Sequence, residues 1–403
     1  MFARHNILRL SIIKVAKWLM LYMPIVVPFY EKNGLTMQSI MILQGIYSVS
    51  IVVMEIPSGY LADVIGRRKT VTLGVTLGAL GFGVYCFGHG FTGFLIAEVI
   101  LGIGQSFVSG ADSALLYDSL LEDGRKGEYT RYEGRITSLG NLAEAVAGIA
   151  GGLLALISLR TPYIAQTLVA AIAIPAAIGL REPVRQTPLL KANFREILRI
   201  TQFALFRNRE LRRNIIFSSI VGAATLTMAW FAQPFFEHTG IALTWYGFLW
   251  TALNLTVAIS AFIAYKLEEK IGQKASVWII ALLIPGGYLA LSGSDSVYGL
   301  ILLFTFYIVR GFATPVLKDY INRITGSDIR ATVLSVRNFI IRLLFAVIGP
   351  FAGYLKDQYS LSQAFLLSGI IFMVLCVITA FVYLASNENI NRLTNYTSRT
   401  RPS

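Results

Sequence analysis

The sequence carries little charge, and this shortage limits what the protein can be. Only 14% of its 403 residues are Asp, Glu, Lys or Arg, whereas a typical soluble protein has about 25%. Hydrophobic residues make up 55% of the chain. Low charge together with a high apolar content indicates a membrane protein rather than a soluble domain.

Cysteine and histidine are also scarce, which excludes several kinds of site. The two cysteines, Cys86 and Cys376, lie inside apolar stretches, so they predict neither a disulfide framework nor a metal site. The three histidines are far apart in the sequence. The chain has no glycine-rich phosphate loop and no pattern of a catalytic triad. We therefore expect neither an enzyme nor a protein with a cofactor.

What the sequence does contain is a series of long apolar stretches. A bilayer core needs about 20 apolar residues for each spanning helix. The chain predicts an all-α membrane protein with twelve such spans, centred near residues 20, 50, 79, 105, 146, 171, 225, 256, 283, 308, 342 and 373. The first stretch, from about Ile7 to Tyr30, has no small-residue cleavage site, so we expect it to remain as a span.

The distribution of positive charge predicts the orientation. The formal net charge is +13. With both termini inside, 27 of the 35 Lys and Arg residues fall on the inner side, and the outer loops hold only Lys32, Arg160 and Lys356. Cytoplasmic loops collect Lys and Arg. This pattern predicts a multi-pass protein of the cytoplasmic membrane with both termini cytoplasmic, and it explains the basic charge without a nucleic-acid partner. We expect a monomer surrounded by lipid.

An internal repeat divides the chain into two similar halves. The phrase PFYEKNGL at 28–35 returns as PFFEHTGI at 234–241, and GYLADVIGRRK at 59–69 aligns with YKLEEKIGQKA at 265–275, both with an offset of 206 residues. We expect two six-helix bundles related as parallel repeats. Each half should begin with a bent helix that proline ends or kinks, followed by a tight turn at Gly34 or Gly240.

The repeat and the polar stretches set the expected domains. These are an N-terminal bundle (1–181), a cytoplasmic linker (182–211), a C-terminal bundle (212–385) and a polar cytoplasmic tail (386–403) that we expect to be disordered. Apolar linker residues recur at helical spacing among basic residues, and these are Leu190, Phe194, Ile197 and Leu198. They predict an amphipathic helix on the inner leaflet, although a solvated linker is an alternative.

The stretch GYLADVIGRRK resembles the signature of the major facilitator superfamily (MFS), roughly G-x-L-A-D-x-x-G-R-R-K, which lies between its second and third spans. The resemblance implies the MFS fold and a secondary transporter with a cavity between two pseudo-symmetric bundles. It also implies a cytoplasmic gate motif that braces the halves, formed here by Gly59, Asp63, Gly66, Arg67, Arg68 and Asp118. Because Asp63 and Arg67 are four residues apart, we expect them to pair on one helix end.

Two further patterns resemble those of drug/proton antiporters within that family, with departures. Span four of these antiporters reads R-x-x-Q-G-x-G, whereas this chain has EVILGIG at 98–104, which keeps both glycines but places Glu98 at the arginine position. Span five keeps the glycines of the antiporter pattern but lacks its proline, and these glycines are Gly148, Gly151 and Gly152. A drug/proton-antiporter-like transporter is the prediction.

Ionisable groups at bilayer depth are costly and therefore mark functional sites. We expect proton or substrate roles for Glu98 and Glu144 in the first half and for Arg310 and Arg342 in the second. Either glutamate is a suitable proton carrier, and the alternative is a structural hydrogen bond to a neighbouring helix. Further cavity candidates from spans one, seven and ten are Tyr22, Trp230, Gln233 and Tyr307. Trp230 fits an interfacial anchor equally well.

Together these observations predict proton-coupled export of a small amphiphilic organic molecule by alternating access. A second hypothesis is the uptake of an anionic or zwitterionic metabolite or siderophore, held by Arg310 and Arg342. A third, of another class, is a membrane sensor built on a transporter scaffold.

Overall fold

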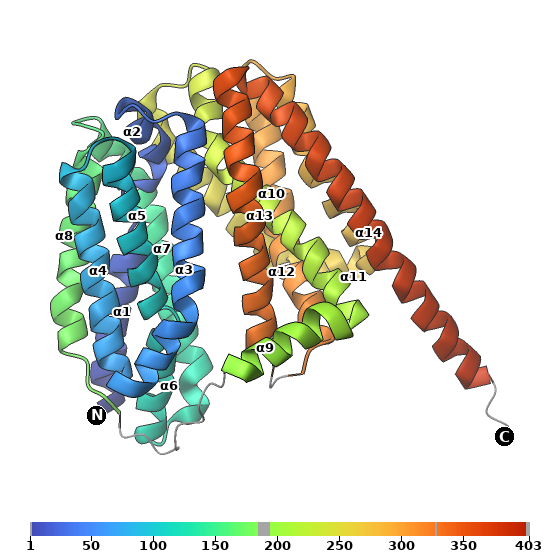
Figure 1. The fold of residues 1–403 in the computed structure, drawn as a ribbon, viewed down its shortest axis with the longest axis horizontal. Helices are drawn as coiled ribbons and strands as arrows, with labels where there is room; N and C mark the ends of the chain where they lie inside the picture. The colour runs from blue at the N-terminus through green and yellow to red at the C-terminus, as the bar shows by residue number, and fades with distance from the viewer. Residues whose placement is uncertain (1, 184–193, 327–328, 400–403) are drawn as a thin grey trace. The chain divides into compact units, whose positions relative to one another are not determined.

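The structure is a computed structural model that describes residues 2–183, 194–326 and 329–399 (Figure 1). Within these residues the regular structure is helical throughout. The chain forms two compact units, one made of Met1–Phe194 and Gln233–Ala252 and the other of Arg195–Ala232 and Leu253–Ser403. Each unit is described by itself below.

The helices match the predicted spans. Eleven helical stretches among the described residues are long and apolar enough to cross a bilayer. One of them, Leu243–Ser292, has 50 residues and contains a break at Gly272, where φ is 80°. It therefore accounts for two crossings, since about 20 residues suffice for one. The prediction of an all-α protein with twelve spans is confirmed.

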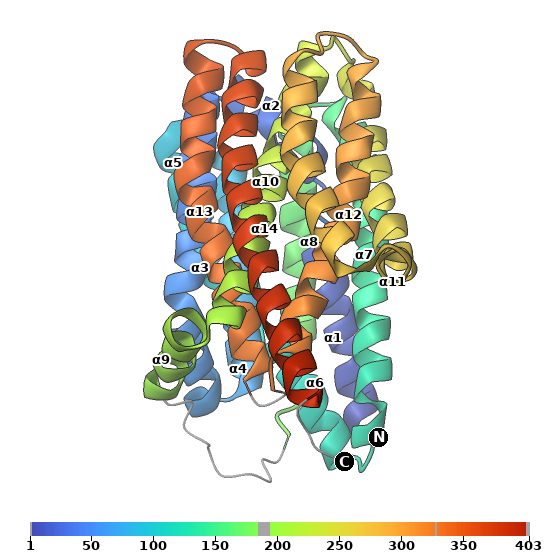
Figure 2. The same ribbon diagram turned by 90° about the vertical axis from the view of Figure 1, so that its right-hand side faces the viewer.

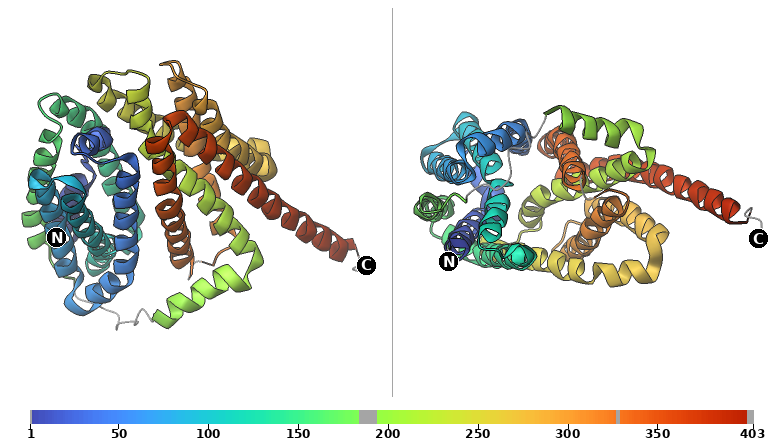
Figure 3. Two further views of the ribbon diagram at one scale, coloured as in Figure 1. Left: turned by 45° about the horizontal axis from the view of Figure 1, so that its top comes forward. Right: turned by 90° about the horizontal axis from the view of Figure 1, so that it is seen from below.

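The first unit contains eight of the labelled α-helices. They are α1 (Phe2–Trp18), α2 (Val26–Lys32), α3 (Met37–Ile65), α4 (Arg67–Phe87), α5 (Gly90–Val108), α6 (Ala111–Glu122), α7 (Tyr129–Ala155) and α8 (Thr161–Ile178). Helix α4 packs against both α5 and α8, and α5 also packs against α3 (Figures 1 and 3). Close to the start of the chain, an apolar core that includes Ile13, Val71 and Leu115 joins α1, α4 and α6.

The second unit contains the remaining helices (Figure 2). They are α9 (Phe194–Gln202), most of α10 (Arg209–His238), α11 (Tyr246–Ser292) beyond Ala252, α12 (Gly299–Arg323), α13 (Arg330–Gln358) and α14 (Leu361–Arg399). The Tyr288 hydroxyl donates to the Ala224 carbonyl at 2.6 Å and so ties α11 to α10. The Tyr288 ring also contacts Phe306, Phe365 and Phe372, which extends this core to α12 and α14.

The internal repeat is visible in the backbone. Gly34 and Gly240 have φ values of 83° and 72°, in the left-handed region that glycine enters without strain. The following N–H groups, of Leu35 and Ile241, donate to carbonyls five residues back at 3.1 and 3.0 Å. The predicted tight turns are therefore confirmed, and each turn ends the first span of its half.

Three other expectations need correction. The first span is not one helix, because α1 ends at Trp18 and α2 begins only at Val26. Of the two alternatives for the prolines, that they end the helices is wrong, since Pro28 and Pro234 lie inside α2 and α10, whereas a kink stays a prediction. Residues 386–399 of the tail, which we expected to be disordered, are helical, because α14 continues from the last span to Arg399.

Part of the segment predicted as an amphipathic linker helix forms α9. Helix α9 begins at Phe194, and Leu198 on it is 43% exposed. Leu190 and the side chains of Phe194 and Ile197 lie outside the described residues. Binding of this segment to the inner leaflet stays a prediction.

Candidate functional site

Glu98 lies at the centre of a buried polar cluster in the first unit. It is on α5 and is 6% exposed. Its Oε1 accepts hydrogen bonds from the hydroxyls of Tyr30 on α2 and Tyr85 on α4, each at 2.7 Å. Gln44 Nε2, on α3, donates to the same oxygen at 2.6 Å. Four helices thus converge on one carboxylate oxygen.

Aromatic rings surround this cluster. The Phe94 and Tyr163 rings both stack on the Tyr85 ring, with centroids 5.2 and 4.9 Å from it. Phe29 lies 4.1 Å from Tyr163. These side chains are at most 2% exposed. Such a shell keeps water away from the carboxylate, and a charge in dry surroundings is costly unless it is paired.

Close helix packing brings the cluster together. A Cβ atom placed on Gly74 of α4 would lie 2.7 Å from the Gly104 carbonyl oxygen of α5. A Cβ on Gly102 would lie 2.7 Å from Cβ of Ser50 on α3. Any larger residue would push the helices apart. The glycines that EVILGIG shares with the antiporter pattern therefore set the short distances from α5 to α3 and α4.

The break in the first span also has polar partners. Gln166 Oε1, on α8, accepts the Leu21 N–H at 3.0 Å. Gln233 Oε1 accepts the Val27 N–H at 3.0 Å, and its Nε2 donates to the Met23 carbonyl at 2.6 Å. At membrane depth, backbone groups outside a helix need such partners. The structure thus uses the amide of Gln233, predicted as a cavity residue, to hold irregular backbone.

The other residues predicted for the first half have different environments. Tyr22 is half-buried, with its ring 5.2 Å from both Phe82 and Tyr163. Its hydroxyl is close enough to Glu98 and Glu144 to interact electrostatically with both carboxyl groups. Glu144 on α7 is half-buried, whereas Glu55 on α3 is exposed. Tyr22 therefore lies near both glutamates of the predicted proton site.

The predicted residues of the second unit lie on α10, α12 and α13. Arg310 is half-buried, with its guanidinium 5.3 Å from the Tyr307 ring. Tyr307 is buried, and its hydroxyl has no hydrogen-bond partner among the described residues. Trp230 and Arg342 are half-buried. Arg337 on α13, which was not among the predicted site residues, is only 5% exposed and donates to the Ser218 hydroxyl.

The gate motif forms contacts at the opposite end of the first unit. The Arg67 guanidinium forms an ion pair with Asp118 and donates to the Ala114 carbonyl at 2.7 Å, which ties α4 to α6. Glu182 was not predicted. Its carboxylate accepts the backbone N–H groups of Arg67 and Arg68 at 2.8 and 2.7 Å. It therefore caps the N-terminus of α4, where a negative charge is stabilising.

The remaining residues of the gate motif lie around the junction of α3 and α4. Gly66, with φ at 100°, separates α3 from α4, so Asp63 and Arg67 do not lie on one helix as expected, and their pairing stays a prediction. The Asp63 side chain lies outside the described part of the structure. Gly59 has open space around its Cα, and Arg68 donates to the Ile178 carbonyl at 2.7 Å.

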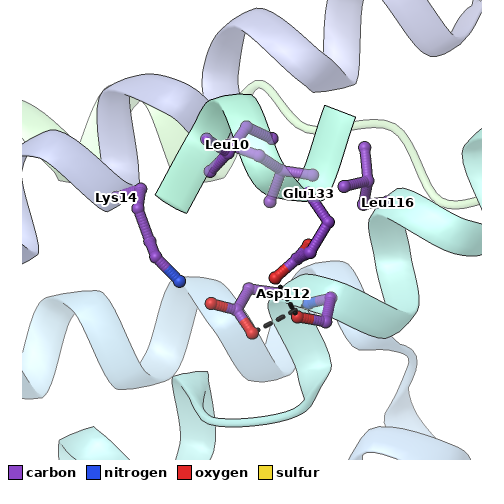
Figure 4. A pocket seen from close by; sticks show the side chains of 7 residues that line it. Leu10, Lys14, Asp112, Leu116 and Glu133 are labelled. Atoms are coloured by element: carbon purple, nitrogen blue, oxygen red, sulfur yellow. Dashed lines mark hydrogen bonds between the residues drawn. The ribbon is translucent and has the colours of Figure 1, made fainter. Parts of the chain in front are cut away.

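A small pocket near this end of the unit contains both signs of charge (Figure 4). Lys14 of α1 faces Asp112 of α6, and Glu133 of α7 lies beside them. Ser113 donates its hydroxyl to Glu133 Oε1 at 3.0 Å, and its N–H to Asp112 Oδ1 at 2.8 Å. The pocket thus joins α1, α6 and α7 at the end where the chain begins. No three His, Cys, Asp or Glu side chains of the described residues could share a metal ion.

The sequence of the chain matches a known family of membrane transporters. The sequence profile of the Major Facilitator Superfamily matches residues 18–236 and 215–402. This chain belongs to the major facilitator superfamily. An uncharacterized MFS-type transporter from Methanocaldococcus jannaschii is 23% identical over 268 residues, which is 66% of this chain and 68% of that relative.

Solved structures give the same fold for this superfamily member. The nucleoside transporter NupG superposes with a TM-score of 0.77 at 16% identity, over 96% of this chain and 99% of that chain. A bacterial homologue of the human lysosomal transporter Spinster gives 0.76 at 18% identity, over 96% and 97%. At this level of identity the similarity shows the fold alone. The protein is a multi-pass secondary transporter of the MFS type and not an enzyme.

Proposed function

We propose that this MFS transporter exports a small amphiphilic organic molecule and that protons drive the transport. The observation that carries the proposal is the buried Glu98, since a carboxylate inside a spanning helix is costly. Its partners are hydroxyl and amide groups, and no Lys, Arg or His of the described residues forms an ion pair with it. A group in such surroundings is suited to binding and releasing a proton.

Glu144 is the second candidate for this role. It lies on α7, and Tyr22 is close enough to interact electrostatically with both Glu144 and Glu98. The half-buried ring of Tyr22 favours a substrate with an apolar body, because binding sites for small organic molecules are mostly apolar with a few polar groups. A cationic substrate would compete with the proton for a carboxylate, which is the simplest basis for antiport.

The proposal is tested in proteoliposomes with an imposed pH gradient, screened against dyes, sugars and organic acids. We expect gradient-driven accumulation of at least one amphiphilic cation by the parent protein. The Glu98→Gln variant should lose this accumulation but keep exchange of substrate without a gradient. The matched control is Glu55→Gln, which makes the same change at an exposed glutamate and should transport as the parent does.

The same assay includes Glu144→Gln and the double variant. If the Glu98→Gln, Glu144→Gln and double variants all accumulate substrate against a gradient as the parent does, neither glutamate carries the coupling proton. Accumulation that follows another ion, or no ion, would remove proton coupling from the proposal.

The second unit supports a different substrate class as the alternative. Arg310 and the buried Arg337 form no ion pair with any carboxylate of the described residues. Cations of this kind, without a carboxylate partner, are suited to an anionic or zwitterionic substrate, for which symport with a proton is more natural. Uptake of organic acids, lost in Arg310→Gln but retained in Glu98→Gln, would favour this alternative.

A further inference from the structure

Three oxygen atoms form a closed triangle: Oε1 of Glu98 and the hydroxyl oxygens of Tyr30 and Tyr85. Tyr30 and Tyr85 hydroxyls each lie 2.7 Å from Glu98 Oε1, and the two hydroxyl oxygens lie 2.6 Å from one another. All three separations are hydrogen-bond distances for an O–H donor and an oxygen acceptor. Each side of the triangle therefore needs a proton between its two oxygens.

The number of available protons depends on the state of Glu98. Each tyrosine hydroxyl supplies one proton, and an ionised carboxylate supplies none. With Glu98 ionised, two protons would have to serve three contacts. If both tyrosines donate to Oε1, the hydroxyl oxygens of Tyr30 and Tyr85 are left facing each other at 2.6 Å without a proton between them. That contact is repulsive.

A proton on Glu98 Oε1 removes this conflict. Each oxygen then donates one hydrogen bond and accepts another, for instance from Glu98 to Tyr30, from Tyr30 to Tyr85 and from Tyr85 back to Glu98. Gln44 Nε2 is a donor in either state, at 2.6 Å from Oε1 and 3.3 Å from the Tyr30 hydroxyl. Because it adds no acceptor, it does not change the proton count of the triangle.

The electrostatic surroundings agree with a neutral group. Four tyrosines lie close enough to interact electrostatically with Glu98, namely Tyr22, Tyr30, Tyr85 and Tyr163. Among the described residues, no cation lies within ion-pair distance of the carboxyl group. Arg160 lies over the Phe29 ring, 5.7 Å from its centroid, and bonds to Cys86, Asn33 and His89. An ionised, unpaired carboxylate in a dry site is disfavoured.

We propose that Glu98, Tyr30 and Tyr85 together form the proton-binding site, and that Glu98 is protonated in the conformation described here. Loss of the proton to water would leave the contact between Tyr30 and Tyr85 unsupported and push these side chains apart. Because Tyr30 is on α2 and Tyr85 is on α4, release of the proton would loosen α2 from α4. Only the use of this step in transport rests on the proposed function.

The test is infrared difference spectroscopy of the purified protein in detergent across a pH titration. The carbonyl stretch of a protonated carboxyl group should be present at neutral pH in the parent and absent in Glu98→Gln. Tyr85→Phe should lower the proton affinity of Glu98 roughly tenfold, which is one pH unit. The matched control is Tyr163→Phe, which removes a buried hydroxyl without a partner among the described residues and should shift the titration far less than Tyr85→Phe does.

The direction of the Tyr85→Phe effect separates two explanations. A charge-assisted hydrogen bond is roughly twice as strong as a neutral one. In the triangle with Glu98 protonated, Tyr85→Phe removes two neutral hydrogen bonds, one to Tyr30 and one to Glu98. With Glu98 ionised, it removes one charge-assisted hydrogen bond, from Tyr85 to Glu98. These losses nearly cancel, so the remaining effect is the removed oxygen–oxygen repulsion, which favours ionisation. If the tyrosines only solvate a carboxylate, the variant loses more from the ionised state and Glu98 holds its proton more tightly.

Either of two results would overturn the inference: no Glu98-dependent carbonyl band in the parent at neutral pH, or tighter proton binding in Tyr85→Phe. Both are independent of transport. If the band is present but transport does not respond to a pH gradient, the proton site stands and the proposed function fails. If Glu98 is ionised in the parent but Glu98→Gln still abolishes gradient-driven transport, the proposed function stands and the hydrogen-bonded triangle of Glu98, Tyr30 and Tyr85 is not its proton site.

Discussion

At the scale of single residues, the most restrictive position in the first unit is a glycine. A Cβ atom on Gly151 of α7 would lie 1.8 Å from the carbonyl oxygen of Leu21. That oxygen belongs to the irregular backbone between α1 and α2, whose Leu21 N–H is held by Gln166. The helix and the break in the first span are therefore in direct backbone contact, and neither can move aside without disturbing the other.

We predict that Gly151→Ala destabilises the protein. Overpacking of a filled interior typically costs about 1–3 kcal/mol, and here the clash is with backbone rather than with a flexible side chain. The measurement is thermal unfolding in detergent, followed by circular dichroism. The matched control is Gly83→Ala on α4, where an added Cβ has no neighbour within 4 Å. An unfolding temperature for Gly151→Ala equal to or above that of the control would contradict the packing described here.

The residues of the candidate site were only partly predictable from the sequence. Glu98 could be identified because a charged residue inside an apolar stretch is conspicuous. Its partners Tyr30, Gln44 and Tyr85 could not be identified in the same way. Tyrosine and glutamine are common in such stretches, and the sequence does not say how each helix is rotated about its axis. Glu182 was missed for a related reason, since it meets Arg67 only when α8 returns beside α4.

At the scale of elements, the start of α1 is tied to two other parts of the first unit. Asn6 is fully buried, and its Nδ2 donates to the Ser119 hydroxyl of α6 and to the Arg181 carbonyl, both at 2.8 Å. The Ala3 N–H donates to Asp123 Oδ2 at 2.9 Å. This hydrogen bond holds the pKa of Asp123 below its ordinary value. The N-terminus of α1 is therefore fixed by one buried amide and one carboxylate near the surface.

We predict that this carboxylate makes stability depend on pH. Because the folded-state pKa of Asp123 lies below the unfolded value, its contribution is complete above the unfolded value and is lost as the pH falls through the folded value. Asp123→Asn should thus unfold at a lower temperature than the parent at pH 7, and the difference should disappear as the pH falls through the folded-state pKa of Asp123. Thermal melts of both proteins across this range provide the measurement. A difference that stays constant with pH would assign it to the shape of the side chain and not to its charge.

Whole elements were more predictable than side chains. The repeat identified the turns at Gly34 and Gly240 because glycine, proline and glutamate recur at one offset. It did not show that the first span is broken while α10 runs unbroken from Arg209 to His238. The break depends on Gln166 and Gln233, which lie far away in the sequence and supply partners for the freed backbone groups. A pattern read along the chain cannot contain such a contact.

At the scale of the whole molecule, the orientation in the membrane is a property of all the charges together. The loops expected outside hold three of the 35 Lys and Arg residues, and an excess of basic residues marks the cytoplasmic side. The fold does not depend on this excess, because two parallel repeats are compatible with either orientation. The predicted location of both termini in the cytoplasm therefore needs a test of its own.

The chain is well suited to a cysteine-accessibility experiment. Its two native cysteines, Cys86 and Cys376, lie within spans, so a version with serine at both positions serves as the background. Ser296, between α11 and α12, and Lys270, beside the break in α11, are both exposed. We predict that Ser296→Cys reacts with a membrane-impermeant maleimide in intact cells, and that Lys270→Cys reacts only after permeabilisation. The reverse pattern would place the termini outside, and reaction of both positions in intact cells would rule out opposite sides for these two loops.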